Sequence, residues 1–500
     1  MAEDSEAAHV TEDNLYEIAR RRGFFYISNE IYGGLTGFYD YGNIGTLLKR
    51  NIENLWRGHF LGLGENFSEI EPSNVMPEKA FVASGHIKNF VDPSVKCRKC
   101  GAWHRADQLV EKSIGMKAEG KGPEELTKLI KEHKIRCDKC GGELGEVRVL
   151  NMMFQLKMGS EGDTVAYLRP ETAQGVYVDF LRQFNVMRSR LPMGLGIVGK
   201  AFRNEISPRQ LLIRQREFTQ AELQVFFDPS KVDECDNWDE VKDYGLMIME
   251  KDGKTKKHKC SELAKSEGLP KFYLYNLAKS QEFFIGVLKF PEQKFRLRRL
   301  SEEEKAFYNK IHFDAEIFLE SLGEYKEVGG IHYRTDHDLL GHQEVSKKSH
   351  GISHEGRNFV PHVIELTVGI DRTLYAAMDL FYRPATKERN WEWFAFPPEM
   401  APYAFAVFPL MGKDGLPELA DKVYGMMKKE YGAVYDGSGS IGRRYARADE
   451  IGVPFAITID YDSLKDGAAT VRNRDDTKQT RVKINDLEEE AERLCTGKSR

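Results

Sequence analysis

Four cysteines stand in two pairs that have the spacing of a metal site. Cys97 and Cys100 form one C-x-x-C pair, and Cys137 and Cys140 form a second pair after 36 intervening residues. Each pair places two thiolates at one tight turn, and two such turns complete the tetrahedral Cys₄ shell that Zn²⁺ prefers in structural sites. A thioredoxin-like redox pair would need a βαβ setting, which is missing here, and inert cysteines are the remaining alternative. We predict one structural Zn²⁺.

A second cluster is rich in arginine and aromatic residues. Residues 202–218 read FRNEISPRQLLIRQREF and carry four arginines, namely Arg203, Arg209, Arg214 and Arg216. The strand-like runs on either side, IVGKAF and FTQAELQVFF, predict an antiparallel hairpin around a long basic loop. Guanidinium groups bind phosphates through paired hydrogen bonds and stay charged in partly buried sites. A solvated charged hairpin is the plain alternative, but the phenylalanines of this segment break the pattern of a surface hairpin.

A third set of residues, within 328–372, supplies chemistry that matches the basic loop. It combines glycines, arginines and a carboxylate in a strand-then-helix setting that includes HVIELTVGIDRTLYAAMDL. Its members are Gly330, Arg334, Glu365, Gly369 and Arg372. This match favours a phosphate-binding site over a solvated surface.

One glycine motif matches a known signature in its letters alone. Gly194, Gly196 and Gly199 spell the dinucleotide-binding fingerprint, which needs a helix after it and an acidic residue about twenty positions on. The residues that follow are KAFRNE and a run of arginines rather than an apolar helix. We therefore reject dinucleotide binding.

The elements that must position these residues follow from hydrophobic spacing. A charged helix is predicted near 12–22, strands and turns at 23–42, and an amphipathic helix at 43–59. Residues 91–150 form a Lys-rich module with all four paired cysteines, in which a helix at 117–134 is expected to extend as an arm. Residues 228–320 are highly charged and mostly helical in pattern, which predicts an insertion. A strand-rich block follows at 325–380.

Beyond a Pro- and Trp-rich loop at 383–398, strand and helix signals alternate to the end of the chain. Such alternation predicts a compact α/β domain at 400–500 with a mostly parallel sheet. The boundary to residues 1–390 should fall near 390–400.

Composition sets limits on the class of protein. The 500 residues and 57.3 kDa imply two or three domains, and 41% hydrophobic with 30% charged residues is typical of a globular protein. With a net charge of −5, any nucleic-acid contact must come from local basic patches. The longest apolar stretch, 400–411, is shorter than the ~20 residues of a membrane helix. The acidic N-terminal segment lacks the features of a signal or transit peptide, so we expect a cytoplasmic protein without membrane contact.

The motifs together resemble a known family. FRNE with RQREF resembles motif 2 of class II aminoacyl-tRNA synthetases, and GIDR at 369–372 resembles motif 3. More narrowly, SNEIYGGLTGFYDYG, FVASGH, HRADQL, LRPETAQG, FRNEISPR, PHVIE and GSIGRRYARADEIGVP resemble the glycyl-tRNA synthetases of the homodimeric archaeal and eukaryotic type. The class motifs are degenerate, whereas LRPETAQG together with FRNEISPR is specific. The resemblance covers the chain from about Leu15 to Leu494.

The resemblance implies an α+β catalytic core, an antiparallel sheet flanked by helices, at 1–390, and an anticodon-binding domain at 400–500. ATP and glycine would react to glycyl-adenylate and pyrophosphate, and the glycyl group would pass to the 3′ end of glycine tRNA. Such transfers depend mainly on positioning and charge neutralisation, so no side-chain nucleophile is required. A homodimer is also implied.

The ATP-binding residues follow from the matched motif positions. They are Arg203, Asn204, Glu205, Arg209, Ile213, Arg214, Arg216, Phe218, Glu327, Val328, Gly369 and Arg372. Arg203 would hold the α-phosphate and Glu205 would read the adenine. Phe218 and Arg372 would cover the two faces of the base. Arg203 and Arg372 are the expected catalytic residues.

The remaining ligands follow from the same positions. Arg209 and Arg214 are candidates for the β- and γ-phosphates, and Glu327 with Glu365 would hold Mg²⁺ through oxygen atoms. The glycine site would contain Arg105, Glu171, Phe218, Glu222, Glu365, Thr367 and Gly369. Its glutamates would bind the ammonium group, Arg105 would lie near the carboxylate, and crowding would exclude any side chain.

Three positions depart from the pattern of the family, the third being Tyr325, which stands where the family usually has tryptophan. Thr367 stands where the family usually has serine, which keeps the hydroxyl and adds a methyl group. Asn43 stands where the family usually has proline at the dimer interface. The added methyl group either tightens the exclusion of alanine or repacks locally, and the second departure weakens the expectation of a dimer.

In the C-terminal part, a Ser/Gly helix start is followed by arginines that we expect to contact tRNA: Arg443, Arg444 and Arg447. Arg472, Arg474 and Arg481 are expected to extend this surface. A solvated, salt-bridged helix is the alternative. For the whole chain, the alternatives are a catalytically inactive relative that binds nucleic acid and a class II enzyme for another amino acid. The retained ATP arginines argue against the first, and LRPETAQG argues against the second.

Overall fold

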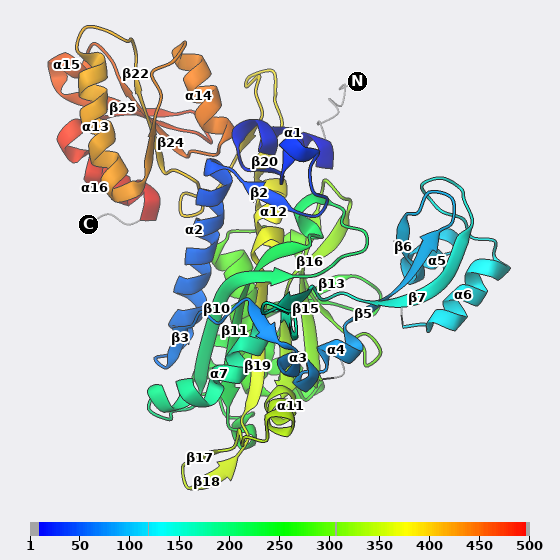
Figure 1. Cartoon of the computed structure of the whole chain (residues 1–500). Helices are drawn as coiled ribbons and strands as arrows, with labels where there is room; N and C mark the ends of the chain where they lie inside the picture. Colours follow the sequence, from blue (N-terminus) through cyan, green and yellow to red (C-terminus); the bar gives the residue numbers. More distant parts are fainter. Residues whose placement is uncertain (1–9, 119, 306–307, 497–500) are drawn as a thin grey trace.

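The computed structural model describes residues 10–118, 120–305 and 308–496. Its centre is a nine-stranded sheet in the order β13-β12-β14-β15-β16-β19-β11-β10-β3 (Figure 1). The strands are β3 (Phe67–Glu69), β10 (Met193–Phe202), β11 (Glu217–Phe227), β12 (Gly245–Met249), β13 (Thr255–Lys259), β14 (Phe295–Arg299), β15 (Ile311–Leu319), β16 (Glu324–Thr335) and β19 (His362–Gly369). β10 with β3 and β12 with β14 pair in parallel, and the other neighbours run antiparallel.

The middle strands are buried, and helices cover them. β11 is buried from Thr219 to Phe227 without the alternation of a half-exposed strand, because side chains on both its faces contact helices. The helices that pack on the sheet are α2 (Asn43–Phe60), α7 (Ala173–Val186), α10 (Lys271–Glu282) and α12 (Ile370–Phe381). This arrangement confirms the predicted antiparallel sheet flanked by helices.

The long strands β10 and β11 form the predicted hairpin. Phe202 pairs with Glu217 at the end of the hairpin that the basic loop closes. The glycine triplet 194–199 lies inside β10 rather than at the start of a helix. Its geometry is therefore that of a strand, in agreement with the rejection of dinucleotide binding.

The prediction of a mostly helical insertion at 228–320 is corrected. The segment does contain α8 (Trp238–Val241), α9 (Cys260–Ser266) and α10, but it also supplies β12, β13, β14 and β15 to the main sheet. Strand β14 reads FRLRR and β13 reads TKKHK, so charged residues alternate with buried ones or lie at the sheet edge. The high charge of these short strands resembles that of a solvated helix, which explains the error.

The N-terminal elements agree closely with the sequence pattern. Helix α1 spans Glu12–Arg22, ends at Gly23 with a positive φ of 72°, and leads into the hairpin of β1 (Phe25–Ile27) and β2 (Tyr39–Tyr41). Asn43 takes the first position of α2, where proline is also well accommodated. The departure at Asn43 therefore leaves this helix start intact.

The cysteine-bearing module projects from the body of the molecule (Figure 1). Its sheet has the order β6-β5-β7, formed by β5 (Val91–Cys97), β6 (Trp103–Arg105) and β7 (Leu144–Asn151). Helices α5 (Ala106–Ile114) and α6 (Pro123–Glu132) share an apolar core with this sheet, in which Leu126 and Ile130 of α6 are buried. The expectation of an extended helical arm at 117–134 is therefore wrong, since α6 packs within the module.

The C-terminal domain has its own core, which begins at Ala404, whereas Met400 and Ala401 still belong to the main core. Its sheet has the order β23-β22-β24-β25-β26: β22 (Phe405–Pro409), β23 (Ala433–Tyr435), β24 (Phe455–Ile459), β25 (Ala468–Asn473) and β26 (Gln479–Lys483). Helices α13 (Leu416–Tyr431), α14 (Ile441–Glu450), α15 (Ser463–Asp466) and α16 (Leu487–Thr496) complete it. Two strand pairs are parallel and two antiparallel, so the expected mostly parallel sheet is in fact mixed.

Several smaller elements complete the fold around the main sheet. They are α3 (Glu78–Ala83), α4 (His86–Asn89), α11 (His337–Ser346), the sheet of β4 (Val75–Pro77), β8 (Gln155–Met158) and β9 (Thr164–Leu168), the hairpin of β17 (Ile352–His354) and β18 (Arg357–Phe359), and the pair β20 (Tyr382–Arg383) and β21 (Trp393–Phe394). In the parts of the chain that the structure describes, no helix has both the length and the apolar character needed to cross a membrane.

Candidate active site

A pocket opens where the basic loop meets the ends of β16 and β19. Its volume of about 570 Å³, counted with its open mouth, is within the usual range of small-molecule sites. The predicted ATP residues that line it are Arg203, Glu205, Ile213, Arg214, Phe218, Glu327, Val328, Gly369 and Arg372. Segments that are 170 residues apart in the chain thus meet at one site, as the sequence predicted.

The arginines of the basic loop are held in defined positions. Arg203 Nε donates to the carbonyl oxygen of Pro170 at 3.0 Å, and its guanidinium lies 5.2 Å from the ring centroid of Phe218. Arg214 Nε donates to Glu205 Oε2 at 2.6 Å. Both guanidinium groups line the pocket, so each presents positive charge to a ligand in it.

Arg372 closes the opposite side of this pocket. Its Nε donates to the carbonyl oxygen of Ile213 at 3.0 Å, and its Nη1 lies 3.1 Å from Glu327 Oε2. Since α12 begins directly after Gly369, the first turn of this helix fixes the arginine next to the strand end. Arg372 and Phe218 therefore both border the space in which a flat base would lie.

Three predicted ATP residues do not line the pocket in this structure. Asn204 is exposed, and Arg209 Nη2 donates to Gln108 Oε1 in the cysteine-bearing module at 3.0 Å. Arg216 Nε donates to the carbonyl oxygen of Glu205 at 3.0 Å, and Nη1 donates to that of Thr36 at 2.9 Å. These hydrogen bonds of Arg216 thus stabilise the conformation of the basic loop.

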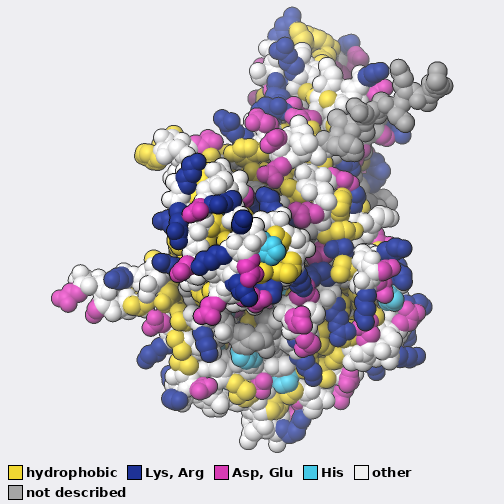
Figure 2. Space-filling model, turned by 90° about the vertical axis from the view of Figure 1, so that its right-hand side faces the viewer, with side chains coloured by type: hydrophobic (Ala, Val, Ile, Leu, Met, Phe, Trp, Pro, Cys, Tyr) yellow, Lys and Arg dark blue, Asp and Glu magenta, His cyan; other side chains and the backbone are white. Residues whose placement is uncertain are grey.

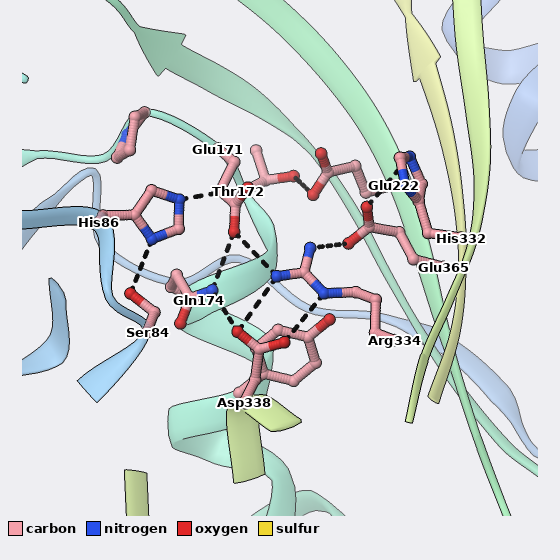
Figure 3. A network of polar contacts seen from close by, with 12 residues as sticks. Ser84, His86, Glu171, Thr172, Gln174, Glu222, His332, Arg334, Asp338 and Glu365 are labelled. Carbon is pink, nitrogen blue, oxygen red and sulfur yellow. Dashed lines mark hydrogen bonds and ion pairs between the residues drawn. The ribbon is translucent and has the colours of Figure 1, made fainter. Parts of the chain in front are cut away.

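Next to the pocket, three buried carboxyl groups contact one guanidinium, and a fourth lies close by (Figure 3). Arg334 of β16 donates from Nη1 to Glu365 Oε2 and from Nε to Asp338 Oδ2, both at 2.9 Å, and its Nη2 lies 3.5 Å from Glu171 Oε1. Glu222 of β11 accepts from Thr172 Oγ1 at 2.6 Å. The cluster is therefore strongly acidic for a buried site.

The surroundings of these carboxyl groups drive their pKa values apart. Burial together with the charges of Glu365 and Glu171 raises the pKa of Glu222 well above its usual value. Burial also acts on Glu171, but His86, Arg334 and Gln174 outweigh it and hold the pKa of Glu171 well below its usual value. Glu222 is thus the carboxyl group that most lacks a positive partner.

Comparisons with known proteins agree with this geometry. The family model described as "tRNA synthetase class II core domain (G, H, P, S and T)" matches residues 154–381, and that described as "Anticodon binding domain" matches residues 404–494. A glycine–tRNA ligase of Pyrococcus furiosus is 38% identical over 97% of this chain and 99% of the relative. One of Methanothermobacter thermautotrophicus is 36% identical over 97% and 99%.

The chain belongs to the glycine–tRNA ligase family. A solved prolyl-tRNA synthetase of Cryptosporidium parvum aligns over 99% of this chain and 79% of its own, with a TM-score of 0.59 and 12% identity. At that identity the likeness concerns the fold, and it agrees with the class II core predicted from motifs 2 and 3. The family assignment also confirms the resemblance that LRPETAQG and FRNEISPR carried.

The structure corrects the predicted place of Arg105 in the glycine site. Its guanidinium lies 3.3 Å from Asp92 Oδ1 and 2.5 Å from Asp107 Oδ2, at the base of the cysteine-bearing module. Asp92 Oδ2 in turn lies 3.9 Å from Arg214 Nη2. Arg105 is therefore committed to a structural ion-pair chain and is not among the residues that line the pocket.

The assignment of Mg²⁺ to Glu327 and Glu365 together is also corrected. Both carboxylate oxygens of Glu365 are engaged: Oε2 accepts from Arg334 and Gln224, and Oε1 accepts from Thr367 Oγ1 at 3.2 Å. Glu327 lies at the pocket wall with a side chain that is 51% exposed. Glu365 thus belongs to the acidic cluster, whereas Glu327 at the pocket wall pairs with Arg372.

The four cysteines meet as the knuckle spacing predicts. Their Sγ atoms all lie within 4.8 Å of one another, with Cys97–Cys140 at 3.5 Å and Cys100–Cys137 at 3.7 Å. A tetrahedral shell with Zn–S bonds of about 2.3 Å has edges of about 3.8 Å, so the cage has the size of a zinc site. A Cβ at Gly142 would lie 3.0 Å from Cys97 Sγ, so glycine is needed beside the cage.

The arginines of α14 differ in their availability. Arg443 is exposed, whereas Arg444 is buried and donates to the carbonyl oxygens of Pro409, Gly437, Ser438 and Gly439. Arg447 is bound to Asp436 at 2.6 Å. The expectation that Arg444 contacts tRNA is therefore wrong in this conformation, because the side chain holds a turn together.

The other basic candidates of this domain are structural as well. Arg472 is buried against Asp449 at 2.9 Å, and Arg474 Nη1 donates to the carbonyl oxygen of Gly452 at 2.8 Å. Arg481 contacts Asp460 at 2.7 Å and Asp466 at 3.0 Å. The expected extension of the basic surface is thus not supported.

Several residues of the acidic cluster received no role from the sequence. Thr172 and Gln174 stand inside the LRPETAQG motif, and Ser84 and His86 stand inside FVASGH. The motifs therefore marked these residues, but their contacts with other residues of the cluster could not be read from the sequence. His332 lies with Nε2 3.6 Å from Glu365 Oε1. Nothing in the local pattern of β16 marks it, because the contact depends on the pairing of β16 with β19.

Proposed function

We propose that this chain is a glycine–tRNA ligase that works in two steps. In the first step, a carboxylate oxygen of glycine attacks the α-phosphorus of ATP, and pyrophosphate leaves. In the second step, a ribose hydroxyl at the 3′ end of glycine tRNA attacks the carbonyl carbon of glycyl-adenylate, and AMP leaves. Neither step needs a covalent bond to the enzyme, in keeping with a pocket built from cations and flat groups.

The pocket between Arg203 and Arg372 is the ATP site of this proposal. Phe218 and Arg372 would cover the two faces of adenine, and Arg203 would neutralise charge that builds on the α-phosphate during attack. Arg214 is paired with Glu205 here and would exchange that partner for a phosphate oxygen. Arg209 would have to leave Gln108 to reach the same ligand.

The single observation that carries an amino acid as the substrate is the acidic cluster beside the ATP pocket. Because Glu171, Glu222 and Glu365 approach one another in a buried space, a ligand with one positive charge is stabilised there. The α-ammonium group of an amino acid has that charge. Thr367 and Gly369 of the adjoining strand line the route from this cluster to the phosphates, and they would crowd the position of any side chain.

Magnesium and tRNA complete the substrates of this proposal. Glu327 would hold Mg²⁺ at the phosphates through an oxygen atom, because its half-exposed carboxylate borders the ATP pocket. The domain at 404–494 would bind the anticodon, and the cysteine-bearing module, with its Zn²⁺, would lie near the acceptor end. Figure 2 shows Lys and Arg side chains, interleaved with acidic ones, on the face that carries this module.

We further propose a homodimer in the cytoplasm. The segment between β1 and β2 presents Ile31, Tyr32 and Leu35 with 87%, 84% and 46% exposure, and such a group of large apolar side chains favours a protein partner. All seven cysteines are free of disulfides, in keeping with a reducing compartment. Light scattering at micromolar concentration would report the mass, and Tyr32→Glu should shift it towards the monomer.

Pyrophosphate exchange tests the activity directly. We expect ATP–pyrophosphate exchange that depends on glycine and is far weaker with alanine, serine or threonine as the amino acid. Exchange with one of the other three would indicate a class II enzyme of different specificity. No exchange with any of them, in a folded protein that binds tRNA, would indicate a catalytically inactive relative.

A further inference from the structure

Ser84 and His86 form a short relay onto a carboxylate of the acidic cluster, with a hydrogen bond between the two residues and a polar contact from His86 to Glu171 (Figure 3). They lie on either side of Gly85, which has a positive φ of 77° and joins α3 to α4. Ser84 Oγ is 2.7 Å from His86 Nδ1, and His86 Nε2 is 3.5 Å from Glu171 Oε2. Ser84 and His86 are almost completely buried, with 2% and 6% exposure.

The chemistry of the groups assigns the direction of this relay. An ionised carboxylate accepts hydrogen bonds and cannot donate one, so His86 must present Nε2–H to Glu171. In a neutral imidazole Nδ1 is then an acceptor, and the hydroxyl of Ser84 donates to it. The opposite tautomer would turn a lone pair towards the carboxylate. The carboxylate of Glu171 thus selects the tautomer, and Ser84 holds the ring through Nδ1.

A Ser-His-Glu set also resembles a nucleophilic triad, but its geometry here is different. In such a triad the base contacts serine through Nε2 and the acid through Nδ1, whereas His86 contacts Ser84 through Nδ1. The 2% exposure of Ser84 leaves its oxygen inaccessible to a substrate carbonyl. His86 also packs between the rings of Phe81 and Phe90, at 6.1 and 5.7 Å, which fixes its plane. This geometry fits a role of His86 in orienting Glu171.

The other oxygen of Glu171 is held separately. Oε1 accepts from Gln174 Nε2 at 2.8 Å and lies 3.5 Å from Arg334 Nη2. His86 alone therefore addresses Oε2 among the described contacts of this carboxylate. Loss of the contact would free the carboxylate to rotate towards Arg334. The direction in which Glu171 offers its lone pairs thus depends on the relay.

We propose that His86, with its ring held in place by Ser84, is a positioning residue for recognition of the amino group of the substrate. It orients Glu171 so that this carboxylate accepts a hydrogen bond from the ammonium group. The inference rests on the proposed function, since Glu171 acts on an ammonium ligand in both. It adds a specific requirement: a hydrogen-bond donor must lie at the position of His86 Nε2, and Ser84 must hold the imidazole in that orientation.

Steady-state exchange kinetics of four variants test this requirement. His86→Ala should raise the KM for glycine by about tenfold, the usual cost of a lost hydrogen bond to a charged group, and leave the KM for ATP unchanged. His86→Gln, whose amide can donate from a similar position, should recover most of the loss. Ser84→Ala should raise the KM for glycine less than His86→Ala. His258→Ala, which breaks a pair with Glu250 on distant β13, is the matched control.

Melting temperatures and the wild-type rate separate the possible failures. If wild-type protein shows no glycine-dependent exchange, the proposed function is wrong. If wild type is active, the relay is refuted when His86→Ala keeps the KM for glycine, or when the KM for glycine and ATP rise together. It is also refuted when folded His86→Gln is as impaired as His86→Ala. Should His86→Ala not fold, Ser84→Ala and His86→Gln decide by the same two KM values.

Discussion

Arg334 donates to Glu365 across the neighbouring strands β16 and β19, with 2.9 Å between Nη1 and Oε2 and side chains that are 2% and 5% exposed. A buried pair of this kind is costly to break, because removal of one partner leaves an unpaired charge inside the protein. The same guanidinium also contacts Asp338 and approaches Glu171. Arg334 thus neutralises part of the negative charge of the cluster, and Glu222 is the carboxyl group whose charge is least compensated.

This relationship predicts a pH dependence of glycine binding. The raised pKa of Glu222 means that the free enzyme keeps this carboxyl protonated into a higher pH range than usual, whereas a bound ammonium group favours its ionised form. The KM for glycine should therefore fall as pH rises through that pKa. Glu222→Gln should raise the KM for glycine by at least about tenfold and remove this dependence. Exchange rates measured from acid to neutral pH give both quantities.

The same group predicts how the stability of the free enzyme varies with pH. A carboxyl whose pKa is higher in the folded state binds more protons there, so its effect on stability becomes less favourable as pH rises from the unfolded pKa through the folded one. Glu222→Gln should consequently melt at a higher temperature than wild type at neutral pH without glycine. Glu217→Gln, on the same strand but paired with Lys200 at the surface, should not. Equal melting temperatures for wild type and Glu222→Gln would contradict the raised pKa of Glu222.

Arg203 should be essential for adenylate formation. Arg203→Ala removes a fixed positive charge beside Phe218 at the wall of the pocket, and we expect a loss of at least ~3 kcal/mol of transition-state stabilisation. Glycine-dependent pyrophosphate exchange should fall by more than a hundredfold. Arg299→Ala, which breaks an exposed pair with Glu267 at the surface, serves as a control. Exchange by Arg203→Ala within fivefold of wild type would overturn the role of Arg203.

The core of this site was predictable because the chemistry is local in sequence. The hairpin of β10 and β11, its basic loop and the turn from β19 into α12 each occupy one continuous segment with a recognisable pattern. Hydrophobic spacing likewise gave α1 and α2 to within a residue or two of their bounds. Where one segment contains both the pattern and the contacts, sequence reasoning succeeded.

The errors concern residues whose role depends on a distant partner. Arg105 and Arg444 have the charge of ligand-binding residues, and only the positions of Asp92 and the turn at 437–439 show that they are structural. His332 meets Glu365 through strand pairing that no local pattern specifies. The prediction of helices for the charged strands at 245–299 was wrong for a related reason, since an edge strand and a solvated helix have similar compositions.

Zinc should support tRNA charging more than adenylate formation. The cage of four thiolates joins the two ends of the module, and the module contacts the ATP loop through Gln108–Arg209 and Asp92–Arg214. We expect one zinc per chain in reduced protein by elemental analysis. Cys137→Ser should lose the metal and lower aminoacylation more than exchange, because the core keeps its own apolar cluster. Cys235→Ser, outside the cage, is the control, and much less than one zinc per chain in wild type would contradict the site.

The C-terminal domain should affect tRNA and leave glycine activation unchanged. Arg443 is exposed on the first turn of α14, and a guanidinium there can stack on an unpaired base or contact a phosphate, as proteins that read RNA loops typically do. Arg443→Ala should raise the KM for tRNA by about three- to tenfold and weaken its dependence on salt, with exchange rates unchanged. Arg493→Ala on α16, also a surface arginine of this domain, is the matched control.

Deletion of residues 404–500, a cut placed between the two cores, should abolish most aminoacylation while glycine-dependent exchange persists in folded protein. If that folded truncation charges tRNA as well as the intact chain, the domain does not read the anticodon.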